Sequence, residues 1–285
     1  MCTLTIIPSS GIRLVCNRDE SRLRSTALPP RVRIVGSRQA VMPVDPVSDG
    51  TWIGASDAGV VAVLMNYYAR PLDARVSNRE TRCDEVQTSC KTAGERGTVP
   101  FCSADYAKSG QSPTVLKPVL VSRGTIVPNV LRAAHLDEAL AIAREMEHRS
   151  YDSFRLLVCD RRHVLECVWS EGEFRVEPLE QIERPRFYTS SGLGDTVVAA
   201  PRQKLFDECF AADNDWPAAQ DAFHRHWWPE NRGASVWMTR DQAMTVSRTE
   251  VDLFANEVRM TYHARVVDSA MLVSARPVSL SVADV

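Results

Sequence analysis

The sequence lacks any apolar run approaching the roughly 18 residues that a membrane-spanning helix needs. It also lacks a basic region followed by an apolar stretch at its start, which a secretory signal peptide would show. Its formal net charge is only −2, so neither nucleic acid nor an anionic membrane is favoured as a general partner. We therefore expect a cytoplasmic protein with no membrane span and no nucleic-acid partner.

Cysteines or histidines at metal-ligand spacing are missing as well. The chain has eight cysteines, but Cys83, Cys90 and Cys102 do not have the close pairing that is typical of zinc sites. His224 and His226 are two residues apart, which places them on different faces of the helix expected there. We predict free thiols rather than a disulfide framework, no metal site, and no cofactor.

The overall composition is that of an ordinary globular protein. The chain has 285 residues, of which 44% are apolar and 25% are charged, so it is long enough to bury a full core. We predict a single domain over residues 1–270 and a loose tail over residues 271–285. Residues 70–117 show clustered charge and no sustained period, so we predict a poorly ordered insertion there.

Strands are predicted at both ends of the domain. The first two, at residues 2–7 and 12–17, are joined by a tight turn. Because alternate residues of a strand face opposite sides, Cys2 should share the apolar face of Leu4 and Ile6.

The predicted order of elements favours stacked antiparallel sheets with helices outside, an α+β fold. Further strands are predicted at about residues 50–54, 60–66, 154–159, 163–170, 173–177, 234–239, 243–251 and 256–262, and helices over about 136–146 and from Pro201 and Pro217 onward. Arginines crowd the stretch from Arg18 to Arg38. We interpret it as a solvated loop region, and a rim that attracts an anionic substrate is the alternative.

Cys2 directly follows the initiator methionine. A small second residue normally allows Met1 to be removed, and Cys2 would then carry both a thiol and a free α-amine. The α-amine titrates near ~8, so it can take a proton from the adjacent thiol. One residue would supply both nucleophile and base, as in N-terminal-nucleophile hydrolases. The alternative is a cysteine that merely happens to stand second.

A charged quartet, Asn17-Arg18-Asp19-Glu20, ends the second predicted strand. Because antiparallel neighbours start and end side by side, this quartet should lie beside Cys2. A guanidinium there would lower the pKa of the thiol, and a carboxylate could hold the α-amine. The alternative is a solvated turn with a surface ion pair.

These motifs together resemble the NRDE family, also called the transport and Golgi organisation protein 2 family. The matching segments are Met1-Cys2, Asn17-Arg18-Asp19-Glu20, Gly50-Thr51-Trp52-Ile53-Gly54, Asn66, Ser122-Arg123-Gly124, Tyr188 to Phe206, and Thr245 to Glu250. The resemblance implies an αββα N-terminal-nucleophile fold with two mostly antiparallel sheets, distantly like penicillin V acylases and bile salt hydrolases.

The resemblance also implies roles for particular residues. Cys2 matches the nucleophile, and Asn66 stands where a side-chain amide would complete an oxyanion hole. Arg18 and Asp19 match the groups that tune the thiol and hold the amine. The acylases carry Arg-Asn-x-Asp at this place, so either Asp19 or Glu20 is a candidate for the acid.

Two further residues are candidates for substrate binding, Trp52 and Ser191. Trp52 belongs to a set of large aromatic side chains that either line an apolar cleft or form plain core. Family members related to the animal proteins carry Ser-Asn where this chain has Ser191-Gly192, so a second amide donor is absent here.

Two functions from different classes follow from these observations. The first is a cysteine hydrolase that cleaves a linear amide or thioester bond of a small acyl substrate. The second is a non-catalytic carrier that uses the same fold to bind an apolar ligand such as haem or an acyl-lipid.

Overall fold

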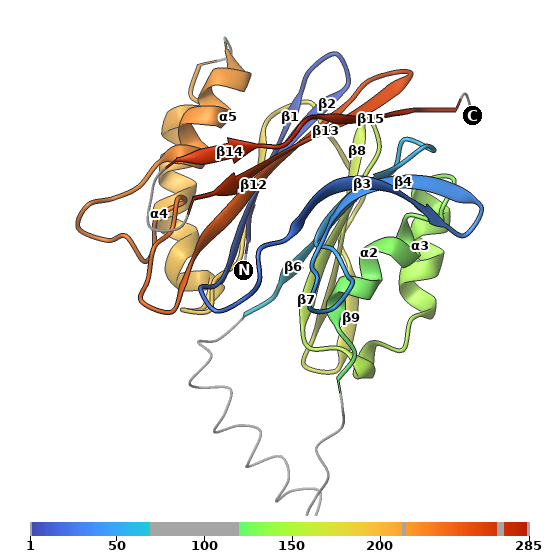
Figure 1. The fold of residues 1–285 in the computed structure, drawn as a ribbon, viewed down its shortest axis with the longest axis horizontal. Coiled ribbons are helices and arrows are strands. Elements are labelled where there is room, and N and C mark those ends of the chain that lie inside the picture. Colours follow the sequence, from blue (N-terminus) through green and yellow to red (C-terminus); the bar gives the residue numbers. More distant parts are fainter. Residues whose placement is uncertain (1, 69–119, 213–214, 267–270, 284–285) are drawn as a thin grey trace, which may run out of the picture.

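The strands of the molecule form two antiparallel sheets stacked face to face, with helices on both outer sides (Figure 1). The computed structural model describes residues 2–68, 120–212, 215–266 and 271–283. This four-layer arrangement confirms the predicted αββα sandwich. The predicted insertion at 70–117 lies outside the described residues.

The first sheet contains the hairpin that begins with Cys2. In the described part of the chain its order is β11-β1-β2-β12-β13-β14, and β15 also pairs with β13. Its strands are β1 (Cys2–Pro8), β2 (Ile12–Ser21), β11 (Arg186–Thr189), β12 (Ala243–Leu253), β13 (Glu257–Arg265), β14 (Leu272–Ser274) and β15 (Val278–Ser281), and its outer face is covered by α4 (Asp195–Cys209) and α5 (Trp216–Arg225).

The second sheet has the order β10-β8-β7-β6-β5-β4-β3, and β9 pairs with β8. Its strands are β3 (Leu28–Val35), β4 (Arg38–Val44), β5 (Ile53–Ser56), β6 (Val61–Asn66), β7 (Phe154–Cys159), β8 (His163–Ser170), β9 (Glu173–Val176) and β10 (Glu180–Gln181). The outer face carries α2 (Ile126–Val130) and α3 (Leu136–Glu145), and short 3-10 turns lie at η1 (Arg123–Thr125) and η2 (His148–Ser150).

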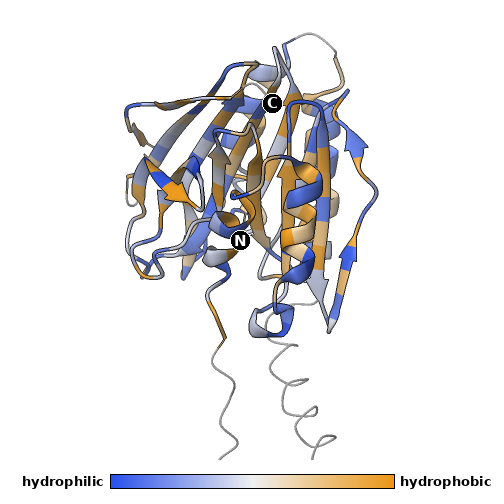
Figure 2. Ribbon diagram, turned by 90° about the vertical axis from the view of Figure 1, so that its right-hand side faces the viewer, coloured by the Kyte–Doolittle hydropathy of each residue, from blue (hydrophilic) through white to orange (hydrophobic). Residues whose placement is uncertain are grey.

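Apolar side chains fill three layers between these elements, and Figure 2 shows hydrophobic residues running along the central strands. The middle layer lies between the sheets and includes Cys2, Leu4 and Ile6, on the face predicted for them. Strand β6 is buried on both sides, because Val63 faces this layer and Leu64 faces the one beneath α2 and α3. A third layer lies beneath α4 and α5. No helix in the described ranges is long and apolar enough to cross a membrane.

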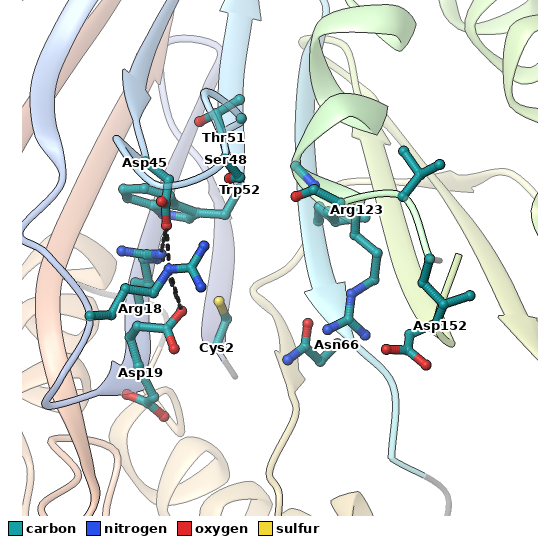
Figure 3. Close-up of a pocket in the computed structure, with 18 of the residues that line it drawn as sticks. Cys2, Arg18, Asp19, Asp45, Ser48, Thr51, Trp52, Asn66, Arg123 and Asp152 are labelled. Atoms are coloured by element: carbon teal, nitrogen blue, oxygen red, sulfur yellow. Dashed lines mark hydrogen bonds and ion pairs between the residues drawn. The ribbon is translucent and has the colours of Figure 1, made fainter. Parts of the chain in front are cut away.

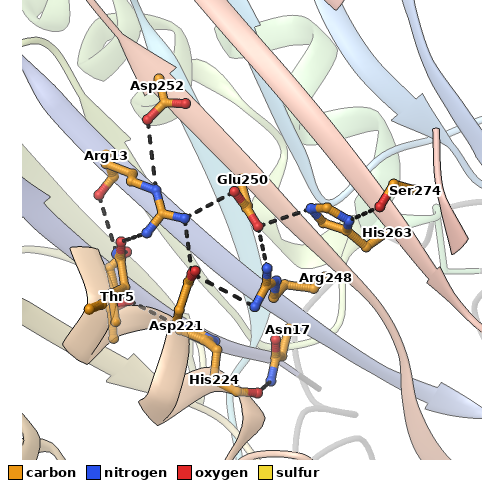
Figure 4. Close-up of polar contacts among 12 residues, drawn as sticks. Thr5, Arg13, Asn17, Asp221, His224, Arg248, Glu250, Asp252, His263 and Ser274 are labelled. Atoms are coloured by element: carbon orange, nitrogen blue, oxygen red, sulfur yellow. Dashed lines mark hydrogen bonds and ion pairs between the residues drawn. The ribbon is translucent and has the colours of Figure 1, made fainter. Parts of the chain in front are cut away.

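A partly buried network of charges joins α5 to the outer face of the first sheet (Figure 4). The Arg13 guanidinium lies 3.0 Å from both Asp221 on α5 and Glu250 on β12. Glu250 also pairs with Arg248 and with His263 on β13. Burial opposes ionisation of Glu250, but a hydrogen bond from His263 and the guanidinium groups of Arg248 and Arg13 hold its pKa at about 2. The network therefore links α5 to β2, β12 and β13 through polar and charged side chains.

Helix α4 starts earlier than the sequence predicts. Pro201 was expected to open this helix, but it lies inside it, because the helix begins at Asp195. A proline inside a helix leaves the carbonyl four residues earlier, here that of Val197, without its amide donor. Val197 is exposed, so water can satisfy that carbonyl.

The strand predicted at residues 234–239 is wrong. This segment forms turns, apart from an isolated bridge at Thr239. Side chains bind three of its carbonyls: Arg202 binds those of Ala234 and Ser235, and Asn17 binds that of Val236. Only the Met238 carbonyl accepts a hydrogen bond from the backbone of β12 within the described residues. Buried apolar residues in this segment therefore mimic the pattern of a strand.

Two other predictions differ from the structure. The arginine-rich stretch interpreted as a solvated loop contains the end of β2, all of β3 and the first residue of β4, and β3 is an edge strand on which Arg31 is exposed. The tail expected to be loose after residue 270 instead adds β14 and β15 to the first sheet. Short edge strands carry few buried apolar residues, so their sequence pattern is weak.

Candidate active site

Cys2 is held at the first position of β1 by both neighbours of that strand. It stands opposite Arg18 of β2. On the other side, its carbonyl accepts a hydrogen bond from the Ser190 amide at 2.9 Å, and its backbone nitrogen donates to the Ser190 hydroxyl at 3.0 Å. The side chain is 4% exposed and faces the layer between the sheets. Backbone contacts on both sides therefore hold the Cys2 side chain in place.

The charged quartet divides between the two faces of β2, as the alternation of a strand requires. Arg18 shares the face of Cys2, and Glu20 lies 3.2 Å from its guanidinium. Asn17 faces the opposite side, where its amide binds the carbonyls of His224 and Val236. Asn17 therefore supports the fold, whereas Arg18 lies at the thiol.

The Arg18 guanidinium is fixed by a carboxylate and an aromatic ring. It lies 2.5 Å from Asp45 and 4.3 Å from the centre of the Trp52 ring. Asp45 also binds Arg24 at 2.8 Å. Sequence reasoning missed Asp45; a lone acidic residue directly after the apolar strand β4 was its only signal. Its charge keeps Arg18 in place and partly neutralises it.

Asp19 is buried on the side of the quartet away from Arg18. The Thr245 hydroxyl donates a hydrogen bond to it at 2.6 Å. Burial raises the pKa of Asp19, while the nearby Arg202 guanidinium and this hydrogen bond oppose the rise. Glu20 is instead engaged with Arg18 and with the amide of Ser21.

A second thiol acts on Cys2. Cys16 lies on the same face of the hairpin, opposite Leu4. A hydrogen bond from the Cys16 thiol lowers the pKa of Cys2 despite burial, and the same contact raises the pKa of Cys16. Burial raises the pKa of Cys167 to about 12. The surroundings of Cys2 therefore lower its thiol pKa, whereas the pKa values of Cys16 and Cys167 are raised.

Asn66 ends β6 and lies across from Cys2 in Figure 3. Its amide donates one hydrogen bond to the Tyr68 hydroxyl at 2.7 Å. Asp195 in turn binds the amides of Tyr68 and Ser191, which ties this wall to the start of α4. A primary amide has two N–H groups, so Asn66 retains a second donor.

Ser191 does not reach the site that the sequence predicts for it. It is fully buried, and its hydroxyl accepts a hydrogen bond from Arg240 at 2.9 Å. It is not among the described residues that line the cleft beside Cys2. Its neighbour Ser190 contacts Cys2 instead, a difference of one residue that the sequence pattern could not resolve.

These side chains surround an open cleft of about 490 Å³ between the ends of the two sheets (Figure 3). It contains the predicted Cys2, Arg18, Asp19, Asn66 and Trp52. Most of its other lining side chains are polar or charged: Glu20, Arg24, Asp45, Ser48, Thr51, Tyr68, Ser122, Arg123 and Asp152. The geometry can present a thiolate, an amide donor and several charges to a bound molecule.

The sequence of the chain matches a known family. The sequence model of the family described as Transport and Golgi organisation 2 matches residues 1–207. The chain belongs to this family. A comparison with curated proteins gave no significant match.

This family member also resembles solved structures. An N-acylethanolamine-hydrolyzing acid amidase ortholog of Caenorhabditis elegans aligns over 87% of this chain and 92% of its own, with 10% identity and a TM-score of 0.50. A mutant conjugated bile acid hydrolase from Clostridium perfringens aligns over 96% and 92%, with 8% identity and a TM-score of 0.46. The likeness to the acid amidase ortholog shows a similar fold at very low sequence identity.

We predict that Cys2 is the most reactive thiol of this family member toward a small alkylating agent. Its lowered pKa raises the thiolate fraction near neutral pH, and only the thiolate reacts. Alkylation at a series of pH values, mapped by peptide mass, should show a lower midpoint for Cys2 than for Cys209. Replacing Cys16 by alanine should raise that midpoint, and replacing it by serine should largely preserve it. Equal midpoints for Cys2 and Cys209 would contradict the prediction.

Proposed function

We propose that this protein is a cysteine hydrolase of the N-terminal-nucleophile type, acting on a linear amide or thioester bond of a small acyl substrate. One observation carries the proposal most strongly. The Cys2 thiol, whose pKa is lowered by its neighbours, opens into a polar cleft that also contains Arg18, Asp19 and Asn66. A nucleophile, a cation, an acid and an amide donor in one cleft are the groups that acyl transfer requires.

The reaction begins with removal of Met1, which leaves Cys2 with a free α-amine. The thiolate attacks the substrate carbonyl, and the amide of Asn66, together with a backbone N–H, stabilises the negative oxygen that forms. The α-amine passes a proton to the leaving amine or thiol as the carbon–heteroatom bond breaks. Water then attacks the thioester between the acyl group and Cys2, and the carboxylic acid is released.

We assign the role of holding the α-amine to Asp19. It directly follows Arg18, the partner of Cys2, at the end of the hairpin where that amine would form. Arg202 and the Thr245 hydroxyl favour its ionised form against the cost of burial. Glu20 already pairs with Arg18, so Asp19 is the better candidate.

The character of the cleft favours the hydrolase over a carrier of haem or an acyl-lipid. Sites for apolar ligands are lined mainly by hydrophobic side chains. Here Trp52, Leu64, Leu120 and Val121 are the large apolar residues among a mostly polar and charged lining. We propose that the protein acts in the cytoplasm, where a reducing environment would keep Cys2 as a thiol.

We expect the mature chain to begin at Cys2 and to become acylated there. Intact mass of the purified protein should show loss of Met1, and exposure to a panel of amide and thioester acyl donors should add one acyl group. Peptide mapping should place that group on Cys2, while the Cys2→Ala variant should gain none. Retention of Met1 in an active preparation would exclude the α-amine as the base. The absence of an adduct or product with every donor would count against the hydrolase.

A further inference from the structure

Two glycine-containing motifs of the sequence meet at the rim of the cleft. The Thr51 amide donates to the Gly124 carbonyl at 3.0 Å. A Cβ added to Gly50 would lie 2.7 Å from the Gly124 Cα, and one added to Gly124 would lie 3.0 Å from the Gly50 Cα. Side chains at these positions would force the two loops apart. The glycines therefore allow the backbone next to Arg123 to rest directly on the loop that carries Trp52.

The Arg123 side chain extends from this contact along the wall opposite Cys2. Its Nη1 donates to the Ser153 carbonyl at 2.8 Å, and the Ser122 hydroxyl caps the short turn that begins at Arg123. Figure 3 shows the guanidinium reaching toward Asn66 and Asp152. One nitrogen is thus anchored, which limits the directions in which the rest of the group can point.

The charge of Arg123 differs from those of the other arginines in the cleft. Arg18 and Arg24 each lie within 2.8 Å of Asp45. Arg123 makes no ion pair with any residue that the structure describes, and it is only partly buried. A planar guanidinium with free N–H groups is well suited to bind a carboxylate or phosphate through two hydrogen bonds.

We propose that Arg123 binds an anionic group of the substrate, a carboxylate or a phosphate, and so determines specificity for charged acyl compounds. The identification of the bound molecule as a substrate rests on the proposed function. The binding of an anion by Arg123, on the wall opposite Cys2, does not depend on the proposed function. Asp152 lies on the same wall and weakens the positive field, so the effect of a single charge should be moderate.

Two alkylating agents that differ only in charge test this proposal without requiring turnover. Iodoacetate is an anion and iodoacetamide is neutral, and both react with a thiolate. The rate of Cys2 alkylation by iodoacetate, divided by the rate with iodoacetamide, should fall about three- to tenfold in Arg123→Gln. This is the effect expected when one charge is removed near a solvent-accessible group. Arg123→Lys, which keeps the charge, should retain most of the ratio. Arg132→Gln removes an exposed arginine outside the cleft and should leave it unchanged.

Protection experiments then identify the anion. Glutarate or inorganic phosphate should slow iodoacetamide alkylation of Cys2 in the wild-type protein, and protection should weaken at least about threefold in Arg123→Gln. Protection by glutarate indicates a carboxylate-bearing substrate, and protection by phosphate indicates a phosphate-bearing one. Thermal unfolding of each variant checks that it is folded.

Some outcomes would overturn the proposal. The proposal is wrong if the iodoacetate-to-iodoacetamide ratio is unchanged in folded Arg123→Gln. It is also wrong if the anions protect the wild type and Arg123→Gln equally, or if neither anion protects Cys2. If Arg123 controls both measurements but no acyl donor is turned over, the anion site stands and the hydrolase proposal fails.

Discussion

Replacing Cys2 by alanine should reduce turnover by at least about 10³-fold while leaving ligand affinity nearly unchanged. The thiolate is the atom that forms the bond to the acyl group, so no other group in the cleft can take over its role. The side chain is small and buried, and most of the cleft is formed by other residues. The turnover number and the equilibrium dissociation constant for a substrate should be measured on the same preparation.

A matched control separates loss of a nucleophile from loss of a buried thiol. Cys159 belongs to the same apolar layer between the sheets as Cys2 and is also fully buried, but burial raises its pKa. Cys159→Ala should therefore lower stability to a similar degree and leave turnover intact. If Cys2→Ala remains active, the protein is not a cysteine hydrolase. If Cys2→Ala instead loses a bound haem, a thiolate ligand to iron in a carrier is supported.

The part of the site that could be predicted from the sequence is the part formed by one hairpin. Strand alternation and antiparallel pairing are local rules, so the apolar face of Cys2 and its position beside the charged quartet follow from residues 2–20. The same alternation places the side chains of Asn17 and Arg18 on opposite faces of β2. Asn66 was found through the family resemblance, and it stands at the end of the buried strand β6.

Residues that reach the site from distant loops could not be predicted in this way. Asp45, Tyr68 and Arg123 approach the cleft from three separate segments, and nothing in their spacing encodes the contact. Ser190 and Ser191 are adjacent and chemically alike, so only the pairing of β11 with β1 decides which one contacts Cys2.

The fold class was predicted correctly, but some individual elements were predicted wrongly for a related physical reason. The segment at 234–239 has the apolar content of a strand, but three of its carbonyls are bound by Arg202 and Asn17. Strands β3, β14 and β15 lie at or near an edge of their sheets and bury few side chains. Long buried strands therefore have a clear apolar pattern in the sequence, whereas the pattern of edge strands is weak.

Replacing Asn66 by alanine should lower the turnover number by roughly 10²–10³, with little change in the Michaelis constant. An oxyanion donor acts mainly in the transition state, so its loss affects the chemical step far more than substrate binding. Asn66→Asp is a matched variant of the same shape that has no N–H to donate, and it should be at least as impaired. Tyr68→Phe removes the hydroxyl that holds the amide, and it should cause a smaller loss.

Asn66 also has a possible purely structural role, which the same samples can test. Its amide is partly buried and bonded to Tyr68, so its loss could cost about 1–3 kcal/mol of unfolding free energy without any catalytic effect. Denaturant unfolding and turnover per folded molecule should therefore be measured together. A variant that is destabilised but fully active per folded molecule would remove Asn66 from the reaction. A variant of normal stability with a strongly reduced turnover number would place its amide at the oxyanion, because only a group that acts in the transition state changes the rate without changing the fold.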